Sequence, residues 1–168
     1  TLKQDDMLVE RMEQEIINDL GKVYPEVGKE QHLVDALCAF HERTEEKMIL
    51  IIDEWDAMFR ECKGQTHILD AYILLLRSLF KSSLTDQLFS GVYMTGILPI
   101  KKYGHESAVS DFYEYTMVDP CPLQEYIGFT ETEVEMLCKK YQKDYALMQQ
   151  WYDGYFVGGI HVYNPKSV

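Results

Sequence analysis

The sequence lacks the residue spacings that usually mark a metal or disulfide site. None of its four cysteines stands in a Cys-x-x-Cys pair, and its five histidines include no His-x-x-x-His or His-Glu-x-x-His spacing. These absences argue against a zinc site, a thioredoxin-like redox site and a metalloprotease. A disulfide framework is not expected in a chain of 168 residues that is 46% hydrophobic, so the cysteines are interpreted as reduced thiols of a cytoplasmic protein.

Basic residues and long apolar runs are also scarce. The 16 Lys and Arg residues stand against 28 Asp and Glu residues, and the resulting formal net charge of −12 disfavours binding to nucleic acid. No stretch approaches the ~18 apolar residues that a membrane span requires, and no signal peptide is recognised. The composition therefore predicts a globular domain with a substantial core, placed in the cytoplasm and not in a membrane.

Unbroken apolar segments predict the strands of a parallel sheet. Residues 48–53 begin with a run rich in β-branched side chains, which is typical of a strand buried on both faces. A long amphipathic helix is predicted over residues 66–84, and the next strand over residues 91–95. A right-handed crossover of this kind places the carboxyl ends of both strands at one edge, where open α/β sheets bind ligands. Residues 114–118 alternate well enough to predict a third strand.

The remaining segments complete a two-part organisation. Further helices are predicted at residues 4–20, 30–43, 130–142 and 145–152, a loop at 97–112, and a hairpin that joins 155–157 to 160–163 through Gly158-Gly159. The helix that starts at Thr130 opens with a capping box. We therefore predict an α/β core over residues 1–122 and a helical, lid-like region with a C-terminal hairpin over residues 123–168.

The acidic residues after the first strand have the chemistry that nucleotide hydrolysis requires. Asp53 is a candidate magnesium ligand, acting through water beside the β- and γ-phosphates, and Glu54 is a candidate general base for the attacking water. Asp56 completes an Asp-Glu-x-Asp string and is a further candidate for nucleotide binding. Thr95, at the end of the neighbouring strand, is a candidate catalytic sensor of the γ-phosphate or the water. Two structural explanations stay open: acidic residues that end a strand because the loop faces solvent, and a threonine that caps backbone groups.

The phosphate-binding half of such a site is not found in the sequence. There is no Gly-x-x-x-x-Gly-Lys-Ser/Thr motif, and the Gly-Lys pairs at residues 21–22 and 28–29 are followed by Val and Glu. Without the backbone N–H groups and the lysine of that loop, most phosphate affinity is lost. The segment alone is therefore expected to hydrolyse ATP poorly. Because its first residue is Thr1, we expect a fragment whose phosphate-binding loop lies upstream.

Several segments, in order, resemble a bacterial family, the AAA-ATPase-like proteins. They are IIDEWDAMF, YILLLRSLFKSSL, VYMTGILPI, EYIGFTETEVEMLCKKY, WYDGYFVGG and VYNPKSV, and the resemblance is close over residues 48–168 and loose over residues 1–47. It implies a partial P-loop NTPase of the additional-strand, AAA-like type, with a three-layer α/β fold. It also implies a phosphate-binding loop upstream of the chain and, in many members, a PD-(D/E)xK nuclease-like domain downstream.

The resemblance also assigns residues. It implies Asp53 and Glu54 as the Walker B pair, Thr95 as the sensor and Mg-ATP as the cofactor of the full-length protein. The family often has an arginine where this chain has Pro99, so the resemblance supplies no arginine at that position.

Two functional interpretations follow from the residues and the resemblance together. The first is the C-terminal part of an ATPase domain that is inactive in isolation, and the alternative is a non-enzymatic interaction module or degenerate ATPase. In the family the phosphate-loop strand lies between the sensor strand and the last strand, so its absence would leave a gap in the sheet. Exposed strand edges invite pairing, and a homo-oligomer or edge-strand pairing is therefore expected.

Overall fold

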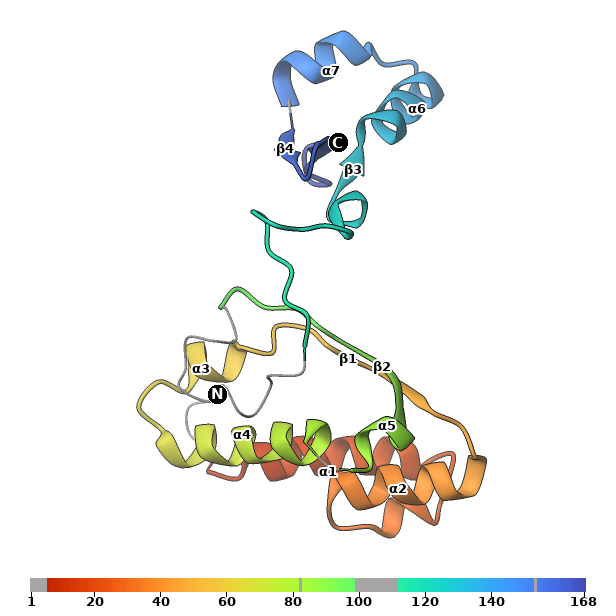
Figure 1. Ribbon diagram of the computed structural model, residues 1–168, viewed down its shortest axis with the longest axis vertical. Coiled ribbons are helices and arrows are strands. Elements are labelled where there is room, and N and C mark those ends of the chain that lie inside the picture. The colour runs from red at the N-terminus through yellow and green to blue at the C-terminus, as the bar shows by residue number, and fades with distance from the viewer. Residues whose placement is uncertain (1–5, 82, 99–111, 153) are drawn as a thin grey trace. The chain divides into compact units, whose positions relative to one another are not determined.

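A computed structural model describes residues 6–81, 83–98, 112–152 and 154–168, and Figure 1 shows its ribbon. The chain divides into two compact units, Thr1–Phe112 and Tyr113–Val168, and each is described by itself. This division lies N-terminal to the boundary predicted between residues 122 and 123. The roles assigned to the two predicted regions, an ATPase core and a lid, stay predictions.

The first unit alternates helices with two strands. Its elements are α1 (Leu8–Gly21), η2 (Val27–Lys29), α2 (Leu33–Thr44), β1 (Met48–Ile52), α3 (Ala57–Glu61), α4 (Thr66–Phe80), α5 (Thr85–Leu88) and β2 (Phe89–Met94). The long helices and both strands confirm the sequence predictions, whereas the short helices α3 and α5 were not predicted. Residues 99–111, which make up most of the predicted 97–112 loop and include Pro99, lie outside the described residues. No helix in the described part of the chain is long and apolar enough to cross a membrane.

The strands β1 and β2 form a two-stranded parallel sheet, as predicted. Their register pairs Ile49 with Gly91 and continues to Ile52 and Met94. The helices α3, α4 and α5 lie between them in the sequence, so the unit is compatible with an α/β fold.

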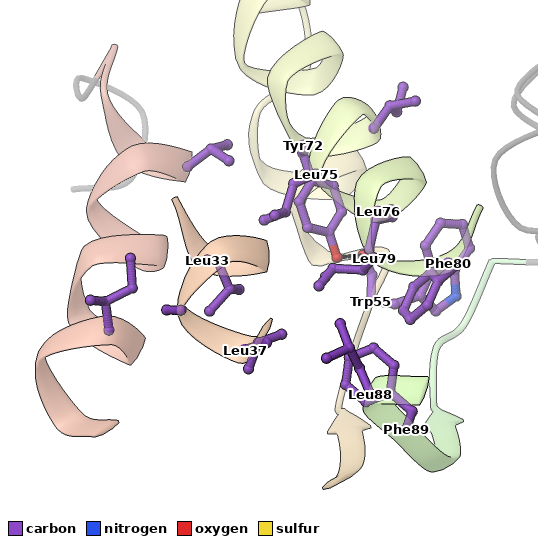
Figure 2. Packing of buried hydrophobic residues seen from close by; sticks show 14 of the residues in the cluster. Leu33, Leu37, Trp55, Tyr72, Leu75, Leu76, Leu79, Phe80, Leu88 and Phe89 are labelled. Carbon is purple, nitrogen blue, oxygen red and sulfur yellow. Dashed lines mark hydrogen bonds between the residues drawn. The ribbon is translucent and has the colours of Figure 1, made fainter. Parts of the chain in front are cut away.

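The helix α4 supplies much of the core of this unit. The buried residues of its wide apolar stripe are Ile68, Tyr72, Ile73, Leu75, Leu76, Leu79 and Phe80. Figure 2 labels five of these side chains, packed with residues from other elements that include Trp55, Leu88 and Phe89; the five are Tyr72, Leu75, Leu76, Leu79 and Phe80. The residues after β1 are therefore anchored to the core through Trp55.

The prediction that Met48–Ile52 is buried on both faces is wrong for the described chain. Ile49 and Ile51 are 71% and 68% exposed, and Tyr93 on β2 is 54% exposed. The alternate residues, such as Leu50 and Ile52, pack against the helical core. Side chains alternate between the faces of a strand, and the described helices cover only one face of this sheet. Within the described part of the first unit, an apolar face of the sheet is left open.

The second unit is a small helical and antiparallel structure. It contains η4 (Gln124–Tyr126), β3 (Phe129–Thr130), α6 (Glu131–Tyr141), α7 (Tyr145–Tyr152), β4 (Tyr155–Val157) and β5 (Ile160–Tyr163), with sheet order β3-β5-β4. The predicted hairpin is confirmed, with Gly158 and Gly159 at φ 57° and 86° in its turn. The capping box of Thr130 and Glu133 is confirmed at the start of α6.

The predicted third parallel strand at residues 114–118 is not formed. The Thr116 hydroxyl oxygen accepts hydrogen bonds from the N–H groups of Val118 and Asp119, and the Thr116 N–H donates to the Asp119 carbonyl at 3.1 Å. Val118 is 94% exposed. A local turn therefore takes up the N–H groups of Thr116 and Val118, which a strand could have used in a sheet.

Candidate functional site

The carboxyl ends of β1 and β2 are held together beyond the last strand residues. The Thr95 N–H donates to the Ile52 carbonyl, and the Trp55 N–H donates to the Thr95 carbonyl, both at 2.9 Å. The two loops that leave the sheet therefore start side by side. This is the edge at which the sequence places the acidic pair and the threonine.

The structure brings Asp53, Glu54 and Thr95 together. The Thr95 hydroxyl donates to Asp53 Oδ1, and its oxygen accepts the Glu54 backbone N–H at 3.1 Å. The side chains of Asp53 and Glu54 remain exposed to solvent, and Thr95 is half-buried. One hydroxyl thus joins both acidic residues while leaving their carboxylates accessible to a ligand.

The backbone of Glu54 has an uncommon conformation. Its φ of 52° lies in the left-handed region, which costs a non-glycine residue about 1–2 kcal/mol. Hydrogen bonds on both sides hold it there, because the Glu54 N–H donates to Thr95 and the Glu54 carbonyl accepts from the Ala57 N–H at 2.8 Å. Strained backbone of this kind is found at functional sites, where the surroundings determine the conformation.

Asp56 has a different environment from the other two acids. Its side chain is 0% exposed, and it accepts the N–H groups of Ile97 at 3.3 Å and Leu98 at 3.1 Å. Its second oxygen also lies 3.2 Å from Arg60 Nε. Both carboxylate oxygens are therefore engaged in the interior, and the geometry favours a structural role for Asp56 over direct contact with a nucleotide.

Arg60 is the residue of this site that the sequence analysis missed. From α3 its Nη2 contacts Glu54 Oε2 at 2.5 Å, while its buried Nε lies 3.2 Å from Asp56 Oδ2 and makes no hydrogen bond. The hydrogen bond to Glu54, with the charge of Asp56 adding to it, raises the pKa of the Arg60 guanidinium. The spacing from Asp56 to Arg60 is i to i+4 at the start of a helix, and that signal could have identified the pair.

Aromatic residues support the site from the core. The Tyr72 hydroxyl donates to the Trp55 carbonyl at 2.9 Å, as the dashed line in Figure 2 marks. Burial, with the charge of Asp56 as a further cause, raises the pKa of Tyr72 to about 12. At Gly96 a Cβ would lie 2.5 Å from Trp55 Nε1, so the second loop needs glycine at this close approach.

The donor set suits a weakly held hard cation better than a protein-caged metal. Among the described residues, no three His, Cys, Asp or Glu side chains form a metal-binding group. Asp53 accepts one hydrogen bond from Thr95, and no other partner is found for its carboxylate in the described chain. Magnesium commonly binds through one or two carboxylates, with water and substrate phosphates completing its shell. Asp53 fits that requirement.

The unit is thus compatible with an α/β fold, and its polar groups gather at the carboxyl edge of a two-stranded parallel sheet. Comparison with protein families matches residues 3–105 to the family described as predicted AAA-ATPase, and the chain belongs to that family. The match contains both strands and all the residues of the site, and residues 106–168 lie outside it. Neither the curated proteins nor the solved structures include a match to this chain.

Proposed function

We propose that the chain carries the magnesium-binding and water-activating half of an ATP-hydrolysis site. The observation that carries the proposal is the single Thr95 hydroxyl that joins Asp53 and the Glu54 backbone at the carboxyl edge of the sheet. Membership in a family described as predicted ATPases supports the same reaction class. The corresponding fold is a partial P-loop NTPase of the additional-strand type.

Each of the three residues has a defined task in this proposal. Asp53 would hold the magnesium ion, which would supply charge neutralisation at the phosphates of the nucleotide. Glu54 accepts a proton from the attacking water, since its carboxylate is exposed at the same edge. Thr95 aligns the two acids. Its only hydroxyl hydrogen is donated to Asp53, so direct donation to the γ-phosphate would require release of that bond.

Asp56 is assigned to positioning in this proposal instead of to nucleotide binding. By accepting the N–H groups of Ile97 and Leu98 it holds the segment after β2 against the segment after β1. The predicted nucleotide contact at Asp56 would require these hydrogen bonds to break, at a cost of about 1.5–3 kcal/mol for each bond to a charged acceptor.

Hydrolysis also needs a phosphate-binding loop, which the sequence of this chain does not contain. The backbone N–H groups and the lysine of such a loop supply most of the affinity for phosphate. In this proposal ATP affinity requires a phosphate-binding loop that these 168 residues do not contain, and the isolated chain is proposed to be weak in ATP binding and inactive in turnover.

A metal probe tests the proposal on the chain itself. With Mn²⁺ and ATP, amide NMR signals of residues 53–55 and 95–97 should broaden selectively, because Mn²⁺ takes the place of Mg²⁺ beside Asp53. Asp53→Asn should remove this broadening, and Asp35→Asn, at an exposed position on α2, should leave it unchanged. If the amide signals of acidic residues broaden uniformly, and Asp53→Asn does not change this broadening, a specific site at Asp53 is contradicted.

Turnover is tested in a protein that combines this chain with its phosphate-binding loop. Glu54→Gln keeps the shape of the side chain and removes the proton acceptor, so ATP should remain bound while hydrolysis falls by at least 100-fold. Normal hydrolysis in that variant would exclude Glu54 as the general base.

A non-enzymatic interaction module is the second candidate function, and one observation favours it. Ile49, Ile51 and Tyr93 leave an apolar face of the sheet exposed. A strand or a second copy of the chain that pairs with an edge of β1 or β2 would cover part of this face. This candidate would be favoured if metal binding and turnover both stay unchanged when Asp53 and Glu54 are substituted.

A further inference from the structure

Arg60 links the proposed general base to the buried part of the site. Its guanidinium contacts Glu54 Oε2 at 2.5 Å and Asp56 Oδ2 at 3.2 Å. The three side chains differ sharply in exposure, which is 60% for Glu54, 28% for Arg60 and 0% for Asp56. The arginine therefore connects a solvent-facing carboxylate to one that is fixed in the interior.

This arrangement restricts a side chain that would otherwise be mobile. An exposed glutamate can rotate about three side-chain torsions, and a general base is effective only when it faces the water that it deprotonates. Asp56 is held by two backbone N–H groups, and Arg60 lies against it within the same short helical segment. The contact with Asp56 is an ion pair without a hydrogen bond from Nε, so it restrains the guanidinium through charge, and the guanidinium contacts a single oxygen of Glu54.

The Glu54–Arg60 pair is expected to matter more for the orientation of the Glu54 carboxylate than for the stability of the fold. Ion pairs with one well-exposed partner contribute about 0–1 kcal/mol to folding. A displacement of about 1 Å in a catalytic group, by contrast, can reduce a rate by about 100-fold. The pair is therefore expected to affect turnover much more than the free energy of unfolding.

We propose that Arg60 is a positioning residue, which holds Oε2 of Glu54 and leaves Oε1 directed to the attacking water. This inference rests on the proposed ATP hydrolysis. In that step Oε1 takes a proton from water, the water oxygen forms a bond to the γ-phosphorus, and the bond from phosphorus to the β–γ bridging oxygen breaks. The bridging oxygen leaves with the electron pair as part of ADP, and Arg60 keeps its proton throughout.

The test compares Arg60→Gln, Arg60→Lys and the matched control Arg43→Gln in a protein that combines this chain with a phosphate-binding loop. Glutamine keeps part of the stem of Arg60 and loses the charge, so kcat should fall about 10–100-fold with KM for ATP within about twofold. Lysine restores a point charge without the guanidinium fork and should recover part of kcat. Arg43, exposed on α2, should have no effect.

A purely structural role would lower the amount of folded protein without this split between kcat and KM. An unchanged or increased kcat in folded Arg60→Gln would overturn the proposal, since an increase would mean that Arg60 restrains Glu54 away from the water. If Arg60→Gln does not fold, Arg60→Lys decides. A kcat at least threefold below that of the wild type at unchanged KM supports positioning, and a wild-type kcat overturns it.

The same experiment separates this inference from the proposed function. Full turnover in Glu54→Gln would remove the hydrolytic role itself. An inactive Glu54→Gln together with a wild-type Arg60→Gln would leave hydrolysis in place and refute only the positioning by Arg60.

Discussion

Replacing Asp56 by asparagine distinguishes a structural carboxylate from a nucleotide ligand. The wild-type side chain is 0% exposed and accepts two backbone N–H groups. Asparagine retains one acceptor oxygen and turns an N–H₂ group toward the other donor, so one hydrogen bond to a charged acceptor is lost, at about 1.5–3 kcal/mol. Arg60 also loses the charge beside its Nε, which is buried and has no hydrogen-bond partner, so this loss adds to the cost. We expect Asp56→Asn to cost about 2–3 kcal/mol.

Urea unfolding followed by tryptophan fluorescence measures this loss. The chain has 2 tryptophans, so a Trp151→Phe background leaves Trp55, adjacent to Asp56, as the reporter of the first unit. Asp56→Ala, which removes both acceptors, should cost more, about 3–5 kcal/mol. The exposed control Asp35→Asn should change stability by less than about 0.5 kcal/mol. If Asp56→Asn also stays within that limit and instead weakens ATP binding, the structural assignment is refuted.

Four further predictions concern packing, ionisation and the open sheet face. Gly96→Ala should destabilise the first unit by about 1–3 kcal/mol in urea unfolding, because its Cβ would lie 2.5 Å from Trp55 Nε1; an unchanged midpoint would refute the loop packing. Because burial raises the pKa of Tyr72 to about 12 from an unfolded value near 10, its contribution is complete below about pH 10 and is lost by about pH 12. The wild type should therefore lose about 3 kcal/mol more than Tyr72→Phe over that range, and parallel pH profiles would contradict this. Thr130→Ala should cost the second unit about 1 kcal/mol in thermal unfolding by removing the capping box, and an unchanged melting temperature would argue against that cap. If the open face mediates pairing, Ile51→Lys should lower the associated fraction in sedimentation velocity without a loss of stability, whereas unchanged association would exclude this face.

Local signals account for the parts of the fold that the sequence predicted. The capping box at Thr130, the glycine pair at residues 158–159 and the apolar run of β1 each depend on neighbouring residues alone. An amphipathic stripe such as that of α4 likewise follows from helical spacing. These elements could be placed from the sequence because the signals that mark them lie within a few residues along the chain.

The errors arose where a more distant or competing interaction decides. An apolar run indicates that a strand can be buried, but it does not show what covers each face, and Ile49 and Ile51 are exposed. Alternation at residues 114–118 suggested a strand, whereas the side chain of Thr116 forms a local turn there. Local hydrogen bonding by threonine competes directly with a sheet ladder.

For the site, the sequence identified the acidic pair and Thr95, and the structure shows why adjacency was predictable. Parallel strands joined by a crossover bring their carboxyl ends together whatever the loops contain. Asp56 and Arg60 depend on tertiary detail, because a string of acidic residues does not reveal which one turns inward. Only the fold shows that Asp56 is buried and that Arg60 lies between Asp56 and Glu54.

The contacts of the site restrain Glu54 at two points, and this restraint bears on the proposed catalysis. Thr95 fixes the backbone of Glu54, while Arg60, anchored on buried Asp56, fixes the end of its side chain. A base held at both its backbone and its carboxylate needs little reorganisation when water and phosphate arrive, and preorganised groups of this kind contribute most to catalysis. Affinity for the nucleotide and alignment of the water are thus separable properties in the proposed enzyme. In this proposal the first depends on a phosphate-binding loop, and the second depends on residues 53–60 and Thr95, which follow β1 and β2.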